Sequence, residues 1–218
     1  INGFIRFCIG LGKKVLIANV VGQQADAIFS LDTERLTTTI SWLGALAYTL
    51  QIYFDFSGYS DMAIGISKIL GFKLPENFDN PYISKSVTEF WKRWHITLGN
   101  WMRNYLYIPL GGNRSSQSRV LLNLFIVFIL SGLWHGAGWN FILWGIYFGL
   151  FLVLERIFIR NNNSKGFWVY VGWLYTFIVV VIGWVLFRIE DIDVAFQFIY
   201  KMFSFDFTAD YIFIYKPD

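Results

Sequence analysis

Hydrophobic residues occur along this chain in long runs that charged residues rarely interrupt. Residues 120–154 and residues 167–187 contain no Asp, Glu, Lys or Arg, and residues 41–66 contain only Asp55 and Asp61. A hydrocarbon core about 30 Å thick is crossed by about 20 apolar residues in a helix. Each of the three runs is therefore predicted to form helix that is long enough to span a membrane.

The run over 120–154 is longer than one span needs, and glycines interrupt it at Gly132-Leu-Trp-His-Gly-Ala-Gly138. This composition is typical of a loop and predicts two helices, at about 119–132 and about 139–158. The first is short, so we expect it to enter the membrane only in part. Irregular backbone at membrane depth is stable only where it packs in protein or lines a cavity, which makes the break a candidate functional feature.

A different pattern precedes these runs. Ser86-Val-Thr-Glu89 fits a capping box, and apolar residues then recur at helical spacing at Phe90, Trp94, Leu98, Trp101 and Tyr105. Pro109 and the pair Gly111-Gly112 end the pattern. It predicts one amphipathic helix over 86–107 that lies at the membrane interface or dips into it, with Trp94 and Trp101 facing apolar surroundings.

The distribution of charge predicts an orientation. Residues 67–119 hold 8 of the 18 basic residues and three acidic ones, which favours the cytoplasmic side for them and for the basic loop at 155–166. Residues 188–218 carry three basic and six acidic residues and are expected on the opposite side. Residues 5–22 contain Lys13-Lys14, and both a span with snorkelling lysines and an interfacial helix stay open for them.

Composition narrows the class of protein. The 218 residues are 56% hydrophobic, 21% aromatic and only 15% charged, whereas soluble domains average about 25% charged. Cys8 is the only cysteine, which excludes a disulfide scaffold, and the net charge of +3 gives no reason to expect nucleic acid as a partner. We expect an all-α fold, a polytopic transmembrane helical bundle with interfacial or re-entrant helices. It would form a single domain over 1–218, and the start at Ile1 suggests a fragment that lacks N-terminal spans.

The two histidines, His95 and His135, are the candidate catalytic groups. A charged side chain at membrane depth costs several kcal/mol, so His135 is expected to be neutral and functional, because its glycine neighbours let a substrate approach the ring. The ordinary alternative is a histidine bonded to a backbone carbonyl. For His95, spacing alone favours a surface residue near lipid headgroups, unless it faces the same cavity. Two histidines this far apart do not have zinc-ligand spacing, so no metal is expected.

Asp55 and Asp61 also need an explanation, because a carboxylate in an apolar run is costly unless it is paired or hydrated. They could pair with Arg or Lys of the basic region, cap a helix break at Gly58, or take part in proton transfer. The structural pairing is favoured, since nothing nearby marks either residue as a catalyst.

Several segments together resemble one known family, the membrane-bound O-acyltransferases of the alginate O-acetyltransferase type. The resemblance lies in residues 51–65, 75–78, 89–98, 105–114 and 131–137, and more weakly in 13–18 and 182–188. It covers most of the chain, and these motifs occur in the family's order.

The resemblance implies a multi-span helical enzyme of the bacterial inner membrane. Such an enzyme moves an acyl group, here acetyl, from a cytoplasmic thioester donor such as acetyl-CoA to a hydroxyl of an exported or cell-envelope polysaccharide. It would bind no other cofactor, would contact membrane lipids and would work with periplasmic acetyltransferase partner proteins. Family members are longer than this chain, which is consistent with a fragment.

The resemblance also assigns roles to residues. His135 corresponds to the family's membrane-buried histidine and would be the general base, with His95 assisting at the second position. The neighbouring Arg93, Trp94, Asn104 and Trp134 are the expected substrate-binding residues. A polytopic transporter and a non-catalytic scaffold of a polysaccharide-export complex are the alternatives, although no inverted repeat, which is frequent in transporters, is visible.

Overall fold

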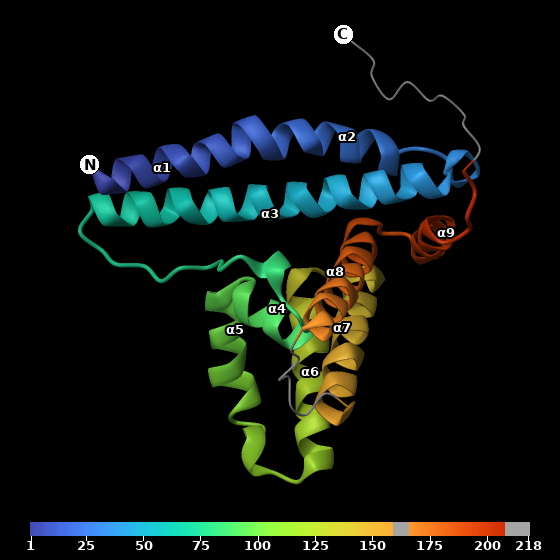
Figure 1. Ribbon diagram of the computed structural model, residues 1–218. Coiled ribbons are helices and arrows are strands. Elements are labelled where there is room, and N and C mark those ends of the chain that lie inside the picture. The colour runs from blue at the N-terminus through green and yellow to red at the C-terminus, as the bar shows by residue number, and fades with distance from the viewer. Residues whose placement is uncertain (159–165, 208–218) are drawn as a thin grey trace. The chain divides into compact units, whose positions relative to one another are not determined.

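The computed structural model of the protein describes residues 1–158 and 166–207, and its regular structure is helical (Figure 1). No β-strand occurs within these ranges, and one isolated antiparallel bridge joins Phe78 to Trp94. The predicted all-α fold is confirmed. The chain forms two compact units, Ile1–Pro75 with Asp191–Asp218, and Glu76–Glu190. The expectation of one domain over 1–218 stays a prediction.

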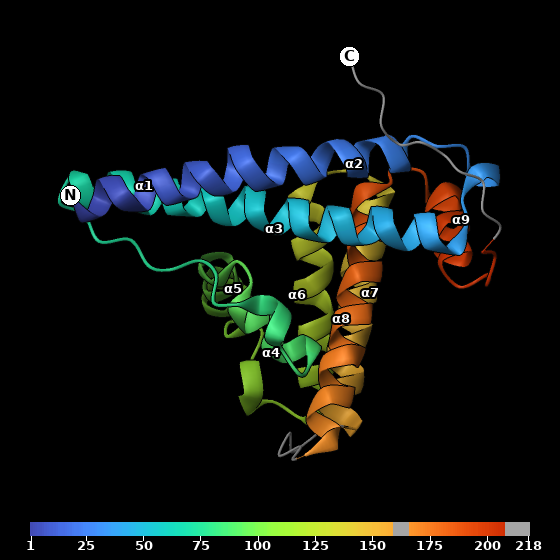
Figure 2. The same cartoon turned by 45° about the horizontal axis from the view of Figure 1, so that its top comes forward.

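The first unit is a pair of antiparallel helical rods. Helix α1 (Asn2–Gly12), a π-helical segment η1 (Lys13–Ala18) and α2 (Asn19–Phe29) follow one another without a break, and the short 3₁₀ helix η2 (Thr33–Arg35) leads into α3 (Thr38–Ile69). Helix α9 (Ile192–Met202) packs at the start of α3, where Trp42 Nε1 donates to the Met202 carbonyl at 2.8 Å. Both views show α1 and α2 running along α3 (Figure 2).

Glycines let α1 and α3 approach closely. A Cβ added to Gly10 would lie 2.5 Å from the carbonyl oxygen of Gly58, and one added to Gly3 would lie 2.7 Å from the carbonyl oxygen of Gly65. Both contacts are far shorter than van der Waals distance, so only glycine fits. Small residues at such positions are typical of helix pairs in membranes.

Ion pairs join the same two helices. The Asp61 carboxylate accepts hydrogen bonds from Arg6 Nε and Lys13 Nζ, both at 2.7 Å, and Lys14 pairs with Asp55. The favoured structural pairing is confirmed, but the cations come from the first rod and not from residues 67–119. Helix α3 also runs unbroken through Gly58, so the helix-break interpretation was wrong.

The second unit contains three of the described helices that are long and apolar enough to cross a membrane. They are α6 (Gln117–His135), α7 (Trp139–Phe158) and α8 (Phe167–Arg188). Helix α3, which covers the run predicted over 41–66, is not among them. Arg160, residues 161–163 and Lys165 of the expected basic loop lie outside the described residues.

The three helices alternate in direction. A Cβ on Gly132 of α6 would lie 2.2 Å from the Phe141 carbonyl oxygen of α7, and one on Gly145 of α7 would lie 2.5 Å from the Phe128 carbonyl oxygen of α6. Between α7 and α8, Asn140 Nδ2 donates to the Phe187 carbonyl at 3.2 Å, and the Tyr147 hydroxyl donates to the Val179 carbonyl at 2.9 Å. The residue numbers rise on one helix and fall on its neighbour, so the pairs α6–α7 and α7–α8 are antiparallel.

Helix α6 is longer than predicted. It reaches His135, so the predicted end near 132 was wrong, and the break is confined to Gly136-Ala-Gly138. The reason is that Gly132 serves the close crossing with α7 rather than ending a helix. With 19 residues, α6 is about 28 Å long, which is enough to cross a hydrocarbon core.

The predicted amphipathic helix over 86–107 is divided. Helix α4 (Val87–Arg93) ends at Trp94, α5 (Ile96–Met102) begins after His95, and a π-helical segment η4 (Arg103–Tyr107) follows. Two 3₁₀ turns flank these helices, η3 (Pro81–Ile83) and η5 (Gly112–Arg114). The prediction of one continuous helix was wrong because residues 77–79 pair with the backbone on both sides of His95.

The start of α4 follows the prediction in part. Ser86 is the N-cap and its hydroxyl accepts from the Glu89 amide at 3.0 Å. The Glu89 carboxylate accepts from the Lys85 amide at 2.9 Å, whereas a full capping box would place it on Ser86. Trp94 is buried as predicted, and Trp101 is half exposed against Tyr105.

Candidate functional site

His95 lies in the turn between α4 and α5, where its backbone adopts a left-handed conformation with φ 48° and ψ 53°. This conformation costs an L-residue other than glycine about 1–2 kcal/mol. Strained backbone at a single residue persists only where the surroundings determine it, and it occurs often at functional sites. The fold therefore sets the direction of the His95 side chain through the backbone conformation of this turn.

His135 is the last residue of α6 and is surrounded by aromatic rings. Its ring centroid lies 4.9 Å from that of Trp134, 5.2 Å from that of Trp144 and 5.0 Å from that of Phe187, all at steep angles between the rings. Phe141 stacks on it at 6.3 Å. Aromatic residues of α6, α7 and α8 thus surround the half-buried imidazole.

Trp134 joins the two histidines. Its ring lies 6.2 Å from that of His95 and 4.9 Å from that of His135, so the two imidazole centroids are separated by at most about 11 Å, the sum of these distances. Trp134 itself is 57% exposed. The fold therefore brings His95 and His135, which are forty positions apart in sequence, to the same end of α6, where both rings lie next to the Trp134 indole.

Burial controls the charge of His95. The loss of water around its ring lowers the pKa of His95 to about 4. The imidazole is therefore neutral at physiological pH, with one nitrogen free of a proton and able to accept one. A neutral imidazole beside a second histidine suits proton transfer from a hydroxyl better than it suits binding an anion.

The predicted substrate-binding residues divide into two groups. The structure brings Trp134 to both histidines, as described above. Trp94 is 5% exposed and packs against Phe78, Phe90 and Trp184, which makes it part of the core of this unit. Arg93 pairs with Glu89 and Asp79, and Asn104 is exposed on η4. The binding roles of these four residues stay predictions.

Other residues at the site gave no signal in the sequence. Trp144 and Phe187 form walls around His135, and their contribution depends on how three helices pack. Glu155 of α7 is buried and accepts hydrogen bonds from the Val87 amide at 2.6 Å and from the Thr88 amide at 2.8 Å and hydroxyl at 2.6 Å. This carboxylate satisfies free amides at the start of α4 and attaches that helix to α7.

No three His, Cys, Asp or Glu side chains within 1–158 and 166–207 lie close enough together to hold a metal ion. What the site offers chemically is two imidazoles, one indole that contacts both, and an apolar enclosure. Such a set can accept and return a proton and can orient a neutral substrate.

Comparison with known proteins places these residues in a family. The sequence profile of the membrane-bound O-acyltransferase family matches residues 3–190. The chain is 51% identical to a probable alginate O-acetylase of Pseudomonas aeruginosa over 204 residues, which cover 94% of this chain and 39% of that protein.

Similarities at lower identity extend to other enzymes that transfer acyl groups. A peptidoglycan O-acetyltransferase of Helicobacter pylori is 44% identical over 88% of this chain and 37% of its own length. A teichoic acid D-alanyltransferase of Bacillus subtilis is 34% identical over 83% of this chain and 47% of its own length. The chain spans less than half the length of each of these relatives. Because the family profile covers most of its residues, the chain belongs to the membrane-bound O-acyltransferase family.

Proposed function

We propose that this chain is the histidine-bearing part of an acyltransferase that esterifies hydroxyl groups of an exported or cell-envelope polysaccharide. The observation that carries the proposal is the pair of histidines joined by Trp134, in a chain of the membrane-bound O-acyltransferase family. The acyl group is acetyl and the donor is a cytoplasmic thioester, acetyl-CoA. We propose further that it is a multi-pass protein of the bacterial inner membrane.

The printed names of the relatives support this acceptor class. They are a probable alginate O-acetylase, a peptidoglycan O-acetyltransferase and a teichoic acid D-alanyltransferase, names that share an acyl transfer to a polymer. The identity to the alginate enzyme favours acetyl over D-alanyl. Periplasmic acetyltransferase proteins are the proposed partners, because the family resemblance implies them for an exported acceptor. Family membership favours catalysis over the transporter and scaffold alternatives.

The chemistry needs little beyond a base and a dry site. The acceptor hydroxyl oxygen attacks the thioester carbonyl carbon while an imidazole nitrogen of His135 takes the hydroxyl proton. The tetrahedral intermediate then collapses, the carbon–sulfur bond breaks and the thiolate takes the proton from His135, which leaves an ester and a thiol. General-base catalysis of this kind contributes about 10²–10⁴-fold. His95 orients the acceptor or polarises the carbonyl from the other side of Trp134.

Substitution of the histidines in the full-length protein tests the proposal. We expect His135→Ala to abolish acetylation of the acceptor glycan and His95→Ala to reduce it severely, while His95→Asn retains some activity if the role is positioning. Mass spectrometry of envelope and exported glycans measures the acetyl content. Trp168→Ala, which removes an exposed ring at the start of α8, is the control variant and should acetylate normally.

Two outcomes would contradict the proposal. Normal acetylation with His135→Ala removes this residue as the base. Loss of acetylation that is accompanied by loss of the protein from the membrane fraction, in His135→Ala but not in Trp168→Ala, shows a structural role instead. A scaffold would keep acetylation in both histidine variants, which separates it from the enzyme.

A further inference from the structure

Residues 77–79 hold the chain on both sides of His95. The Asp79 amide donates to the Arg93 carbonyl at 3.0 Å, and the Ile96 amide donates to the Asn77 carbonyl at 3.0 Å. One bond therefore lies two residues before His95 and the other lies directly after it. His95, with its left-handed backbone, therefore lies between two residues, Arg93 and Ile96, that backbone hydrogen bonds to residues 77–79 hold in place.

The side chain of Asn77 adds two further bonds. Its Oδ1 accepts from the Thr97 amide at 3.2 Å and from the Thr97 hydroxyl at 2.9 Å, and the residue is 9% exposed. The first amides of a helix have no partner within the helix and are usually capped by the N-cap side chain. His95 occupies the N-cap of α5 without making such a bond, so Asn77 satisfies this amide from another part of the chain.

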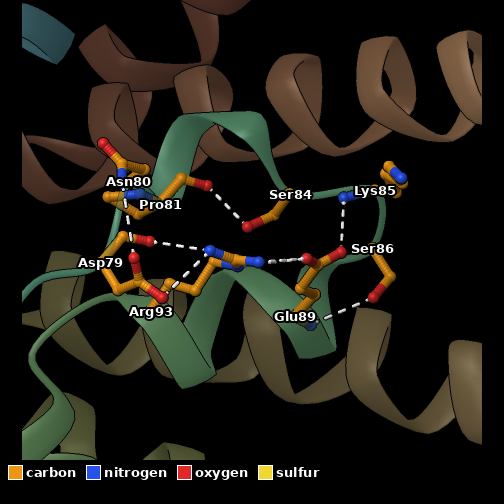
Figure 3. A network of polar contacts seen from close by, with 8 residues as sticks. All are labelled: Asp79, Asn80, Pro81, Ser84, Lys85, Ser86, Glu89 and Arg93. Carbon is orange, nitrogen blue, oxygen red and sulfur yellow. Dashed lines mark hydrogen bonds and ion pairs between the residues drawn. The ribbon is translucent and has the colours of Figure 1, made fainter.

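The other end of the segment is attached to α4. Arg93 Nη1 donates to the Asp79 carbonyl at 3.1 Å and to its carboxylate at 3.2 Å, and Arg93 Nε donates to Glu89 at 3.1 Å (Figure 3). Phe78 packs edge-on against Trp94 at 5.0 Å. The segment is thus held by α4 at one end while Asn77 holds α5 at the other.

We propose that Asn77 is a positioning residue for His95, an inference that rests on the proposed function. Its amide oxygen fixes the first turn of α5, keeps α4 and α5 apart and directs the His95 ring to Trp134. The apolar spacing from Phe90 to Tyr105 favours one continuous helix. Without the Asn77 side chain, α4 and α5 can join into that continuous helix. Joining them would move φ of His95 from 48° to about −63°, which relieves the backbone strain and turns the imidazole away from Trp134.

Kinetics of the full-length protein in membrane vesicles, with acetyl-CoA as donor, test this role. We expect Asn77→Ala to lower kcat by about tenfold or more with little change in KM, since misplacement of a catalytic group by about 1 Å can cost 10²-fold. Asn77→Asp keeps an oxygen acceptor for both Thr97 bonds and should retain most of kcat. Asn100→Ala, an exposed residue of α5, is the matched control and should behave as wild type.

A readout that is independent of activity separates the two proposals. Spin labels at the exposed positions Lys92 and Asn100 report the distance between α4 and α5. In Asn77→Ala this distance should move toward the value of about 12 Å for eight residues of continuous helix, and in Asn77→Asp it should not. If His95→Ala keeps full activity, the proposed function of His95 fails, while a changed label distance still supports the structural role of Asn77.

Wild-type kcat together with a wild-type label distance in Asn77→Ala overturns the inference. If Asn77→Ala does not accumulate in membranes, variants of Thr97 decide. Thr97→Val loses only the hydroxyl donor and is expected to lower kcat severalfold relative to Thr97→Ser, which keeps it. Equal kcat in these two variants also overturns the inference.

Discussion

The imidazole of His95 is kept neutral by its surroundings. Burial lowers its pKa to about 4, and the left-handed backbone directs the ring to Trp134. A neutral imidazole can donate one hydrogen bond and accept another, so this environment keeps His95 able to orient the acceptor over the whole physiological range. The enclosing aromatic rings of His135 provide the same kind of apolar environment by packing alone.

The shifted pKa of His95 makes stability depend on pH. In the unfolded chain the ring binds a proton below its ordinary value of 6.5, and in the folded protein it does so only near 4. The stability that comes from the neutral ring is therefore complete above about 6.5 and is lost as the pH falls toward 4. We expect thermal unfolding of the detergent-solubilised protein to shift to lower temperature between about pH 7.5 and about pH 5.5.

His95→Asn is the matched variant for this measurement. Asparagine tolerates the left-handed backbone but does not titrate, so the variant should lose less stability over the same pH interval. An identical pH dependence in the two proteins would show that His95 is not the group responsible.

At the scale of elements, the hydrophobic runs predicted the helices well and the site poorly. The positions of α7 and α8 follow from uncharged runs, because apolar length alone specifies a membrane helix. The break at His95 could not be predicted, since it depends on Asn77, which lies 18 residues earlier, overriding a clear helical period. The family motifs indicated His95 and His135, whereas Trp144 and Phe187 became visible only once three helices were packed.

The glycines also show how far local patterns extend. Gly132 was interpreted as part of a break because glycine usually interrupts helices, yet it lies in α6 where α7 crosses. The equivalent contacts of Gly3 and Gly10 with α3 gave no signal, because their partners lie 62 and 48 residues away. Periodicity in the sequence does not predict contacts between helices that lie far apart along the chain.

Close packing of α1 on α3 gives a prediction for Gly10→Ala. The added Cβ would lie 2.5 Å from the Gly58 carbonyl oxygen and 2.8 Å from the Met62 amide nitrogen, and both are backbone atoms. The helices must separate to admit it, which we expect to cost about 1–3 kcal/mol and to disturb the ion pairs of Asp61. Thermal unfolding in detergent and the amount of protein in the membrane fraction measure the effect.

Gly12→Ala is the control in the same helix. A Cβ at Gly12 meets nothing within 4 Å, and alanine favours helix by up to about 1 kcal/mol relative to glycine. We therefore expect Gly12→Ala to be neutral or stabilising. Equal behaviour of the two variants would mean that the close approach of α1 and α3 does not hold this unit together.

At the scale of the whole molecule, the second unit fixes which ends of the helices lie on the same side. Antiparallel packing places the start of α6 with the end of α7, and His135 with the end of α8. Leu110 and Asn113 lie at the first of these ends, where they bond to Asn123 and Arg156, whereas His95 lies at the His135 end. If α6 spans the membrane, residues 76–119 therefore reach both of its sides. The cytoplasmic prediction is kept by the parts at the Gln117 end, which are residues 107–119 and the start of α4, where Val87 and Thr88 bond to Glu155 near the end of α7.

Basic residues then set the orientation. Arg114, Arg119 and Arg156 gather at the Gln117 end of α6, whereas Arg188 and Glu190 lie together at the opposite end. The positive-inside rule therefore places the Gln117 end in the cytoplasm. Single cysteines in a Cys8→Ser background, labelled with a membrane-impermeant reagent, test this. We expect Ser116→Cys and Phe167→Cys to react only from the cytoplasm, and Ala137→Cys and Glu190→Cys only from the other side. Reaction of both Ser116→Cys and Ala137→Cys from the cytoplasm would make α6 re-entrant and would place both histidines on the side where the donor arrives.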